Sequence, residues 1–155
     1  MGNGFSVIET EIGILRIDYV DDLLLGVQKI AVCPDDVGNV SRISIKTERE
    51  LAQYFSGQRT HFDIPFKLIG TEFQKRVWNE LCRIPYGKTR SYKQVAEAIG
   101  CQGGSRAVGM ANNRNPLLII VPCHRVIGSD GKLVGFGCGI ATKSFLLDLE
   151  KKTCE

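Results

Sequence analysis

Long hydrophobic runs are absent from this sequence of 155 residues. The longest run, Leu117–Val121, lies between two prolines and is far shorter than the roughly 20 apolar residues that a membrane-spanning helix needs. We therefore expect no transmembrane segment. Met1–Val20 contains two glutamates and lacks a basic start followed by an apolar block, so we also expect no signal peptide and a cytoplasmic location.

Metal-binding patterns are scarce as well. The chain has six cysteines and two histidines, but no pair of cysteines shows the C-x-x-C spacing of zinc or thioredoxin-like sites. Cys33 and His61 remain as an alternative pair of metal ligands, although 28 positions separate them. Because nothing indicates export, a disulfide framework is not expected and the thiols are predicted to be reduced. We expect no metal and no cofactor.

Internal repeats and low-complexity segments are also absent, which excludes repeat arrays. The hydrophobic and charged fractions, 43% and 24%, are those of an ordinary globular protein. At this length the chain fits a single unit, or a small module beside a somewhat larger one.

Charge is distributed unevenly along the chain. Residues 1–70 hold seven Lys and Arg against ten Asp and Glu, whereas residues 71–155 hold thirteen against seven. A basic half of this kind attracts a phosphate backbone through counterion release. A solvated surface rich in Lys and Arg is the alternative, and charge alone does not decide between the two.

The first third of the chain has the pattern of a small sheet. Residues 1–30 alternate between polar and apolar positions, which predicts strands with turns near Gly13 and Asp21. Glu48–Phe55 has a helical pattern that ends at Gly57.

The second half of the chain has a helical pattern. Thr71-x-x-Gln74 and Ser91-x-x-Gln94 are capping-box signatures, and each predicts a helix that begins directly after its first residue. A third short helix is predicted over Ser105–Ala111. The second and third helices, joined by a glycine-rich turn, have the dimensions of a helix-turn-helix, with plain helix packing as the alternative.

The last predicted helix runs from Ala141 to about Lys152. One of its faces carries Lys143, Leu146, Leu147 and Glu150. A carboxylate on a largely apolar face needs a partner, because burying an unpaired charge is costly.

Cys123 stands between Pro122 and His124, directly after the apolar run. A thiol with the reference pKa of about 8.5 is only a few per cent thiolate at neutral pH, so a cysteine nucleophile needs a base or a positive charge nearby. His124 and Arg125 could supply both. The alternative is a buried structural cysteine followed by a histidine of the core.

The C-terminal half contains the stretches GTEFQKRVW, IPYGKTRSYKQVAEAIG, SRAVGMANNRNPLLIIVPCHRVIGSDGKLVGF and KSFLLDLE. With them, residues 70–150 closely resemble the methylated-DNA–protein-cysteine methyltransferases, the O6-alkylguanine-DNA alkyltransferases. The pentapeptide PCHRV is highly specific in this context, and residues 1–69 resemble the family only loosely. The resemblance implies an α+β fold. It predicts a small N-terminal α/β domain of ribonuclease H type over residues 1–69 and a mainly helical, winged-helix-like domain with a helix-turn-helix over residues 70–155.

The resemblance also implies DNA repair by direct reversal of base damage. Cys123 would take the alkyl group from guanine O6 and keep it, so that each molecule acts once. His124 would act through a bound water as the base that removes the thiol proton, and Glu150 would orient that histidine. Asn115 matches the asparagine that holds the loop beside the cysteine. O4-alkylthymine stays open as a second substrate.

The same resemblance assigns contacts with double-stranded DNA, which a monomer would bind through the minor groove. Arg106 would enter the base stack in place of the flipped guanine, Tyr92 would crowd the target phosphate and then bind the flipped base, and Lys93 would meet a phosphate. Arg125 is expected to be a buried structural arginine. The other positions predicted near DNA are Phe73, Cys101, Ser105 and Ser129. The predicted substrate pocket consists of Tyr92, Val126, Phe136 and Gly137.

Three alternatives to an alkyltransferase remain. A lesion-binding protein without transfer activity would carry tryptophan in place of Cys123. A hydrolase using Cys123 and His124 would turn over repeatedly. A DNA-binding regulator would recognise a sequence in undamaged DNA, for which the small residues of the third predicted helix offer few base-reading side chains.

Overall fold

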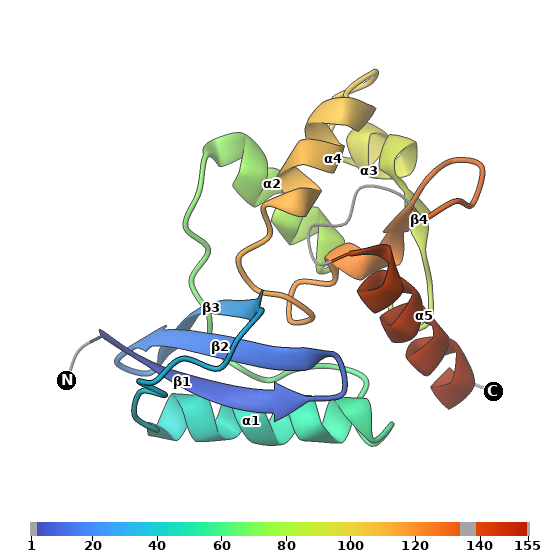
Figure 1. Ribbon diagram of the computed structural model, residues 1–155. Helices are drawn as coiled ribbons and strands as arrows, with labels where there is room; N and C mark the ends of the chain where they lie inside the picture. The colour runs from blue at the N-terminus through green and yellow to red at the C-terminus, as the bar shows by residue number, and fades with distance from the viewer. Residues whose placement is uncertain (1–2, 134–138, 155) are drawn as a thin grey trace. The chain divides into compact units, whose positions relative to one another are not determined.

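The computed structural model describes residues 3–133 and 139–154 (Figure 1). Within these ranges it contains a three-stranded antiparallel sheet, a two-stranded parallel sheet and five α-helices. The predicted mixture of helices with a small sheet is confirmed. None of the helices in these ranges is both long enough and apolar enough to cross a membrane.

The chain forms two compact units. The first consists of Met1–Ile69 and Pro116–Ile120, and the second of Gly70–Asn115 and Val121–Glu155. The apolar run 117–121 is therefore divided, with its first four residues in the first unit and Val121 in the second.

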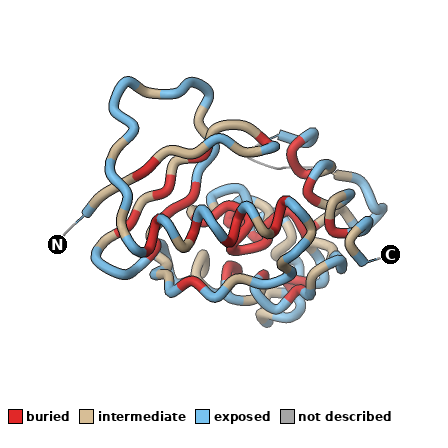
Figure 2. Tube along the Cα trace, turned by 90° about the horizontal axis from the view of Figure 1, so that it is seen from below, coloured by how far each residue is buried: buried red, intermediate tan, exposed pale blue. Residues whose placement is uncertain are grey.

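The sheet of the first unit follows the alternation of its sequence. Its strands are β1 (Asn3–Thr10), β2 (Gly13–Val20) and β3 (Leu23–Ile30), paired in that order. Successive side chains of a strand point to opposite faces, and on β2 the buried positions alternate with partly exposed ones. Figure 2 shows where buried and exposed residues lie along the chain. The helix α1 (Arg42–Phe55) lies across one face of the sheet (Figure 1).

Helix α1 begins six residues before the predicted start at Glu48, so that boundary was wrong. The reason is a capping box made of two serines. The Ser41 hydroxyl accepts the backbone N–H of Ser44, and the Ser44 hydroxyl accepts the N–H of Ser41. Serine replaces the Glu or Gln that usually marks the third helical position. The predicted end is confirmed, since Gly57 follows the helix with a left-handed φ of 80°.

The second unit is mainly helical. Both predicted capping boxes are present, at Thr71 with Gln74 and at Ser91 with Gln94. Gly100 ends the second of these helices with a φ of 74°, in the left-handed region that favours glycine. The elements of this unit are α2 (Glu72–Leu81), β4 (Arg90–Ser91), α3 (Tyr92–Ala98), α4 (Ser105–Asn113), the 3-10 helix η1 (Cys123–Arg125), β5 (Val126–Ile127) and α5 (Ile140–Cys154).

Packing in the second unit brings the helices around one core. Helix α4 contacts both α2 and α3, and the indole Nε1 of Trp78 on α2 donates to the carbonyl of Ala111 on α4, at 2.8 Å. The short strands β4 and β5 pair in parallel, and α5 packs against η1. These contacts bring the turn that carries Cys123 close to side chains from α3, α4 and α5.

Candidate active site

Cys123 is the first residue of η1, and its side chain is buried, with 3% exposure. Two side-chain amides hold the turn around it. Asn115 donates to the carbonyl of Val121 at 2.7 Å, and Asn112 donates to the carbonyl of Cys123 itself at 3.3 Å. The backbone on both sides of the thiol is therefore fixed by residues at the end of α4 and directly after it.

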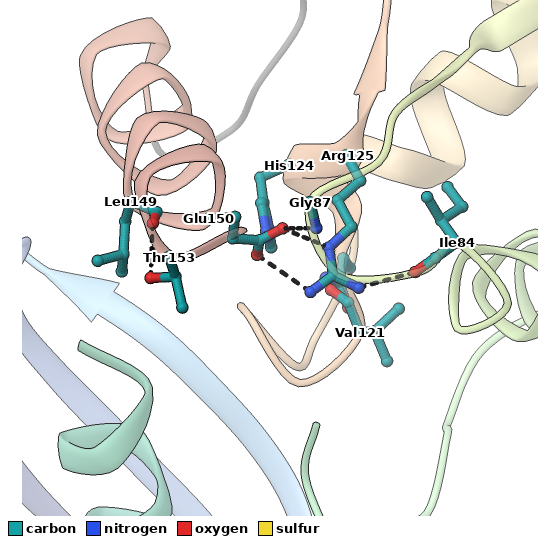
Figure 3. A network of polar contacts seen from close by, with 9 residues as sticks. Ile84, Gly87, Val121, His124, Arg125, Leu149, Glu150 and Thr153 are labelled. Carbon is teal, nitrogen blue, oxygen red and sulfur yellow. Dashed lines mark hydrogen bonds and ion pairs between the residues drawn. The ribbon is translucent and has the colours of Figure 1, made fainter. Parts of the chain in front are cut away.

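His124 follows the cysteine and is fully buried. Its Nε2 lies 2.6 Å from Oε2 of Glu150 on α5 (Figure 3). An ionised carboxylate can only accept a hydrogen bond, so Nε2 carries the proton and Nδ1 of the neutral ring is the basic atom. Nδ1 has no hydrogen-bond partner among the described residues. Burial lowers the pKa of His124, and the hydrogen bond with Glu150 offsets this only in part.

Glu150 accepts three further hydrogen bonds (Figure 3). Two come from the guanidinium of Arg125, from Nε at 2.8 Å and from Nη2 at 3.0 Å, and one from the backbone N–H of Gly87 at 3.1 Å. Burial alone raises the pKa of Glu150, but the hydrogen bonds and charges of His124 and Arg125 outweigh it and hold the pKa well below its usual range. The acid on the apolar face of the last helix is therefore a paired carboxylate.

A buried lysine lies on the same helix, two turns before Glu150. Lys143 has no exposed surface, and its Nζ lies 3.4 Å from the hydroxyl of Tyr92 at the start of α3. Burial lowers the pKa of Lys143 to about 8, and the charge of Cys123 acts in the opposite direction. Burial also raises the pKa of Tyr92, as does the charge of Cys123. The side chains of Cys123, Tyr92 and Lys143 thus interact with one another, with the tyrosine partly exposed.

Helix α4 leaves room for Tyr92. A Cβ atom added at Gly109 would lie 3.8 Å from the tyrosine ring, which is ordinary van der Waals contact. The ring therefore lies beside Gly109, three positions before Asn112 on α4, with enough space between ring and helix for a methyl group.

Other predicted residues share two hollows in the second unit. Lys93 and Ser129 line a pocket of about 350 Å³ beside β4, together with Ser91 and Gln94. Phe73 lines a groove of about 230 Å³ between α2 and α4.

Among the remaining predicted residues, Val126 contacts the site, because its backbone N–H donates to the carbonyl of Cys123. Ser105 and Arg106 form the first turn of α4, with the arginine exposed, and Cys101 is half-buried in the turn before it. Val126 is buried in β5. Phe136 and Gly137 lie outside the described residues.

Sequence reasoning missed two residues of this site as functional groups, Asn112 and Lys143. Asn112 lies four positions after the buried Val108, on the buried face of α4, and an amide at such a position is a signal that could have been used. Lys143 lies on the same apolar face that singled out Glu150, so the same argument applied to it. Among residues 3–133 and 139–154, no three His, Cys, Asp or Glu side chains gather as they would around a metal ion.

Comparison with known proteins places the chain in a family. Residues 72–152 match the family described as 6-O-methylguanine DNA methyltransferase, DNA binding domain. The methylated-DNA–protein-cysteine methyltransferase of Methanosarcina barkeri is 46% identical over 153 residues, covering 95% of this chain and 96% of that protein. The chain belongs to the methylated-DNA–protein-cysteine methyltransferase family. The similarity therefore covers the N-terminal residues as well as residues 70–150.

Two further members of the methyltransferase family are similar to this chain. The Mycobacterium leprae enzyme is 58% identical over 102 residues, which cover 66% of this chain and 62% of that protein. The crystal structure of Mycobacterium tuberculosis OGT in complex with DNA superposes with a TM-score of 0.87 at 42% identity, covering 96% of this chain and 93% of that one. The chain is thus a DNA-repair methyltransferase, and DNA is its partner.

Proposed function

We propose that the chain repairs O6-alkylguanine in DNA by moving the alkyl group irreversibly to Cys123. The observation that supports this most directly is the histidine beside the buried thiol. His124 is tied through Nε2 to Glu150, which leaves its basic Nδ1 without a hydrogen-bond partner among the described residues. A neutral, oriented imidazole next to a thiol is what a nucleophilic cysteine requires.

The proposed reaction begins with loss of the thiol proton. Nδ1 of His124 takes this proton from Cys123 through a water molecule, while Glu150 stays ionised and stabilises the imidazolium. The ammonium of Lys143 favours the thiolate electrostatically. The hydrogen bonds of Asn115 and Asn112 to the turn keep the sulfur in place during this step.

The thiolate then attacks the alkyl carbon on guanine O6. A sulfur–carbon bond forms while the carbon–O6 bond breaks, and the electron pair of that bond stays on the guanine. The guanine takes one proton from the hydroxyl of Tyr92, its proposed donor, and the proton that the imidazolium took from the thiol then passes to the Tyr92 phenolate, so that both side chains return to their neutral forms. A thioether has no good leaving group, and the proposed reaction therefore stops after one equivalent.

Access to the alkylated base is proposed to occur by base flipping through the minor groove of double-stranded DNA. Flipping costs a few kcal/mol of unstacking, and insertion of the exposed Arg106 at the start of α4 would offset part of this cost. Lys93 and Ser129, which share one pocket, are proposed to hold a backbone phosphate. The other proposed DNA contacts are Phe73, Cys101 and Ser105. The proposed substrate pocket consists of Tyr92, Val126, Phe136 and Gly137.

The finer fold assignments belong to the same proposal. The helices α3 and α4 would serve as the helix-turn-helix of a winged-helix-like domain acting as a monomer, and the sheet with α1 would form a ribonuclease H-like domain. The antiparallel order of β1, β2 and β3 with α1 across the sheet is compatible with that assignment. A cytoplasmic location is proposed because DNA is the partner.

Mass spectrometry of the intact protein and its peptides, after incubation with duplex DNA containing one O6-methylguanine, tests the proposed function. We expect a single added methyl group on the Cys123 peptide, saturating at one per protein. Cys123→Ala should lose the methyl group and keep DNA binding, while Cys82→Ala, which removes a different thiol, should keep both. Methyl release beyond one equivalent would indicate a hydrolase. Lesion binding without modification would indicate a damage sensor.

A further inference from the structure

Every nitrogen of the Arg125 guanidinium donates a hydrogen bond, and two of these bonds go to Glu150. Its guanidinium is buried and makes a two-bond fork with the carboxylate of Glu150 (Figure 3). The remaining terminal nitrogen, Nη1, donates to the carbonyl of Ile84 at 2.8 Å. The ring of Tyr86 lies 5.5 Å from the guanidinium carbon. The arginine is thus held in one orientation, and it holds the carboxylate in turn.

The carboxylate of Glu150 has all of its acceptor positions in use. Oε1 accepts from Nε of Arg125 and from the N–H of Gly87, and Oε2 accepts from Nη2 of Arg125 and from His124. A guanidinium is always charged in proteins, so the negative charge of Glu150 is compensated whether or not His124 carries a second proton. In this respect the site differs from a carboxylate paired with histidine alone, which would strongly favour the imidazolium.

The charges around His124 also disfavour its protonated form. From α5 it faces Glu150 and Lys143, and on its own element it lies between Arg125 and Cys123, which carries no charge while its thiol is protonated. One carboxylate thus stands against two cations, and a proton on the imidazole would add a third positive charge in a buried place. The nearby titratable groups on other elements are Cys82 after α2, Tyr86 before β4 and Tyr92 on α3. A thiol and phenols are uncharged at neutral pH, and desolvation raises the pKa of each of them further.

We propose that Arg125 is a positioning residue of the transfer reaction, which neutralises Glu150 and so keeps His124 in its neutral, proton-accepting form. This inference rests on the proposed function. The imidazole would gain its proton only when Cys123 loses one, since the new thiolate then supplies the missing negative charge. Arg125 would thereby make the base available across the neutral pH range without touching the substrate.

The test uses the fact that the chain has two histidines, His61 and His124. In a His61→Gln background, NMR titration of the single remaining imidazole reports His124 directly. We expect the ring of the otherwise unchanged protein to stay neutral down to pH 6 or below. In Arg125→Gln its titration midpoint should rise to about pH 8, so that about a tenth of the rings remain neutral at pH 7. A midpoint at or above pH 7 in the protein that retains Arg125 would overturn the inference, and this measurement needs no variant at position 125.

Rates of methyl transfer to the same proteins give the functional readout. Arg125→Gln should be slowed at least tenfold at pH 7 and should recover much of its rate at pH 9, where the imidazole is neutral again. Arg125→Lys keeps the charge without the fork, so it should restore the pH profile of the unaltered protein at a rate reduced less than in Arg125→Gln. Equal slowing of both variants at every pH, with an unchanged midpoint for His124, would show that Arg125 is only structural.

Two outcomes separate this inference from the proposed function. If Arg125→Gln does not fold, the double variant Arg125→Gln/Glu150→Gln removes both buried charges together, and it should fold and keep His124 neutral. A His124 titration midpoint at or above pH 7 in that double variant would contradict the inference. If the protein transfers no methyl group and its NMR titrations still behave as expected, the proposed function fails while the electrostatic role of Arg125 stands.

Discussion

The two units each bury one carboxylate within the described residues, and the comparison shows what a buried acid needs to become part of a reactive site. Glu50 in the first unit and Glu150 in the second are both 1% exposed. Each accepts a backbone N–H from a loop, from Asp63 at 2.8 Å and from Gly87 at 3.1 Å, respectively. In each case burial raises the pKa and the surrounding donors more than reverse this effect, so both pKa values lie below the usual range.

The difference lies in the partners. Glu50 is paired with Lys46 at 2.7 Å and Arg59 at 3.4 Å, whose side chains are 32% and 22% exposed. Glu150 is paired with Arg125 and with His124, whose side chains are 9% and 0% exposed. Glu50, with its partly solvated cations, attaches the loop of Asp63 to helix α1. Glu150 instead orients a buried histidine whose basic nitrogen can accept the proton of a neighbouring thiol.

The largest expected effect separates the two acids by activity. Glu150→Gln should slow methyl transfer by about 10² to 10⁴-fold, the range that general acid–base catalysis contributes, because His124 loses the acceptor that fixes its tautomer. Glu50→Gln should leave the rate per folded molecule unchanged. Single-turnover assays with O6-methylguanine DNA measure both. An equal loss in the two variants would mean that Glu150 contributes only to stability.

The next expected effect concerns the buried cation, for which the described part of the first unit has no equivalent among its buried residues. With the pKa of Lys143 lowered to about 8 from 10.5, the unfolded chain binds more protons than the folded one between these pH values. Stability contributed by this position therefore rises with pH across that window. Lys143→Met should be more stable than the unaltered protein at pH 7 by up to about 3 kcal/mol, with the difference shrinking toward pH 10.5.

Urea unfolding of both proteins at several pH values between 7 and 10.5 checks this expectation. The comparison of variant with unaltered protein cancels the titration of the other groups. If the surroundings of Lys143 fully offset the cost of burying its charge, Lys143→Met would instead be less stable than the unaltered protein, by the same amount at every pH.

A smaller stability effect is expected at Glu50. Breaking a buried ion pair costs about 3–5 kcal/mol, but the cations here are partly solvated and glutamine can still accept the N–H of Asp63, so Glu50→Gln should cost about 2 kcal/mol. Because the folded pKa of Glu50 lies below its unfolded value, the stabilisation is present above the unfolded pKa and is lost as pH falls through the folded one. Acid unfolding of the variant should accordingly start from a lower stability and fall less steeply. A variant as stable as the unaltered protein would show that the loop is held by other contacts.

The features that the sequence predicted correctly are those with a local cause. The capping boxes at Thr71 and Ser91 involve residues three positions apart, so both helix starts were correct. The start of α1 was wrong because its box uses Ser44 in place of an acid or amide. Helix periodicity also indicated that Glu150 needed a partner, since that argument requires only one face of one helix.

The contacts that complete the site are long-range, and no spacing rule encodes them. The fork from Arg125 reaches a residue 25 positions away, and Gly87 donates across 63 positions. The roles of Cys123 and His124 came from the family resemblance, because neighbouring residues along a chain need not act together. The helical pattern indicated which face of α5 carries Glu150. Only the packing of α5 against η1 shows that this face meets His124 and Arg125.

The smallest expected effect tests whether exposure of the partners decides the strength of these pairs. Lys46 lies one turn before Glu50 on α1, and an i,i+4 pair with one partly exposed member contributes about 0.3–0.5 kcal/mol. Lys46→Met should therefore cost about 0.5 kcal/mol, since Arg59 and the N–H of Asp63 remain on the carboxylate. Thermal unfolding at low and high salt measures this, and salt should remove most of the difference. A loss of stability close to that of Glu50→Gln would mean that the partly exposed Lys46 holds the carboxylate almost alone. The exposure of the partners would then no longer explain why Glu150 belongs to a reactive site and Glu50 does not.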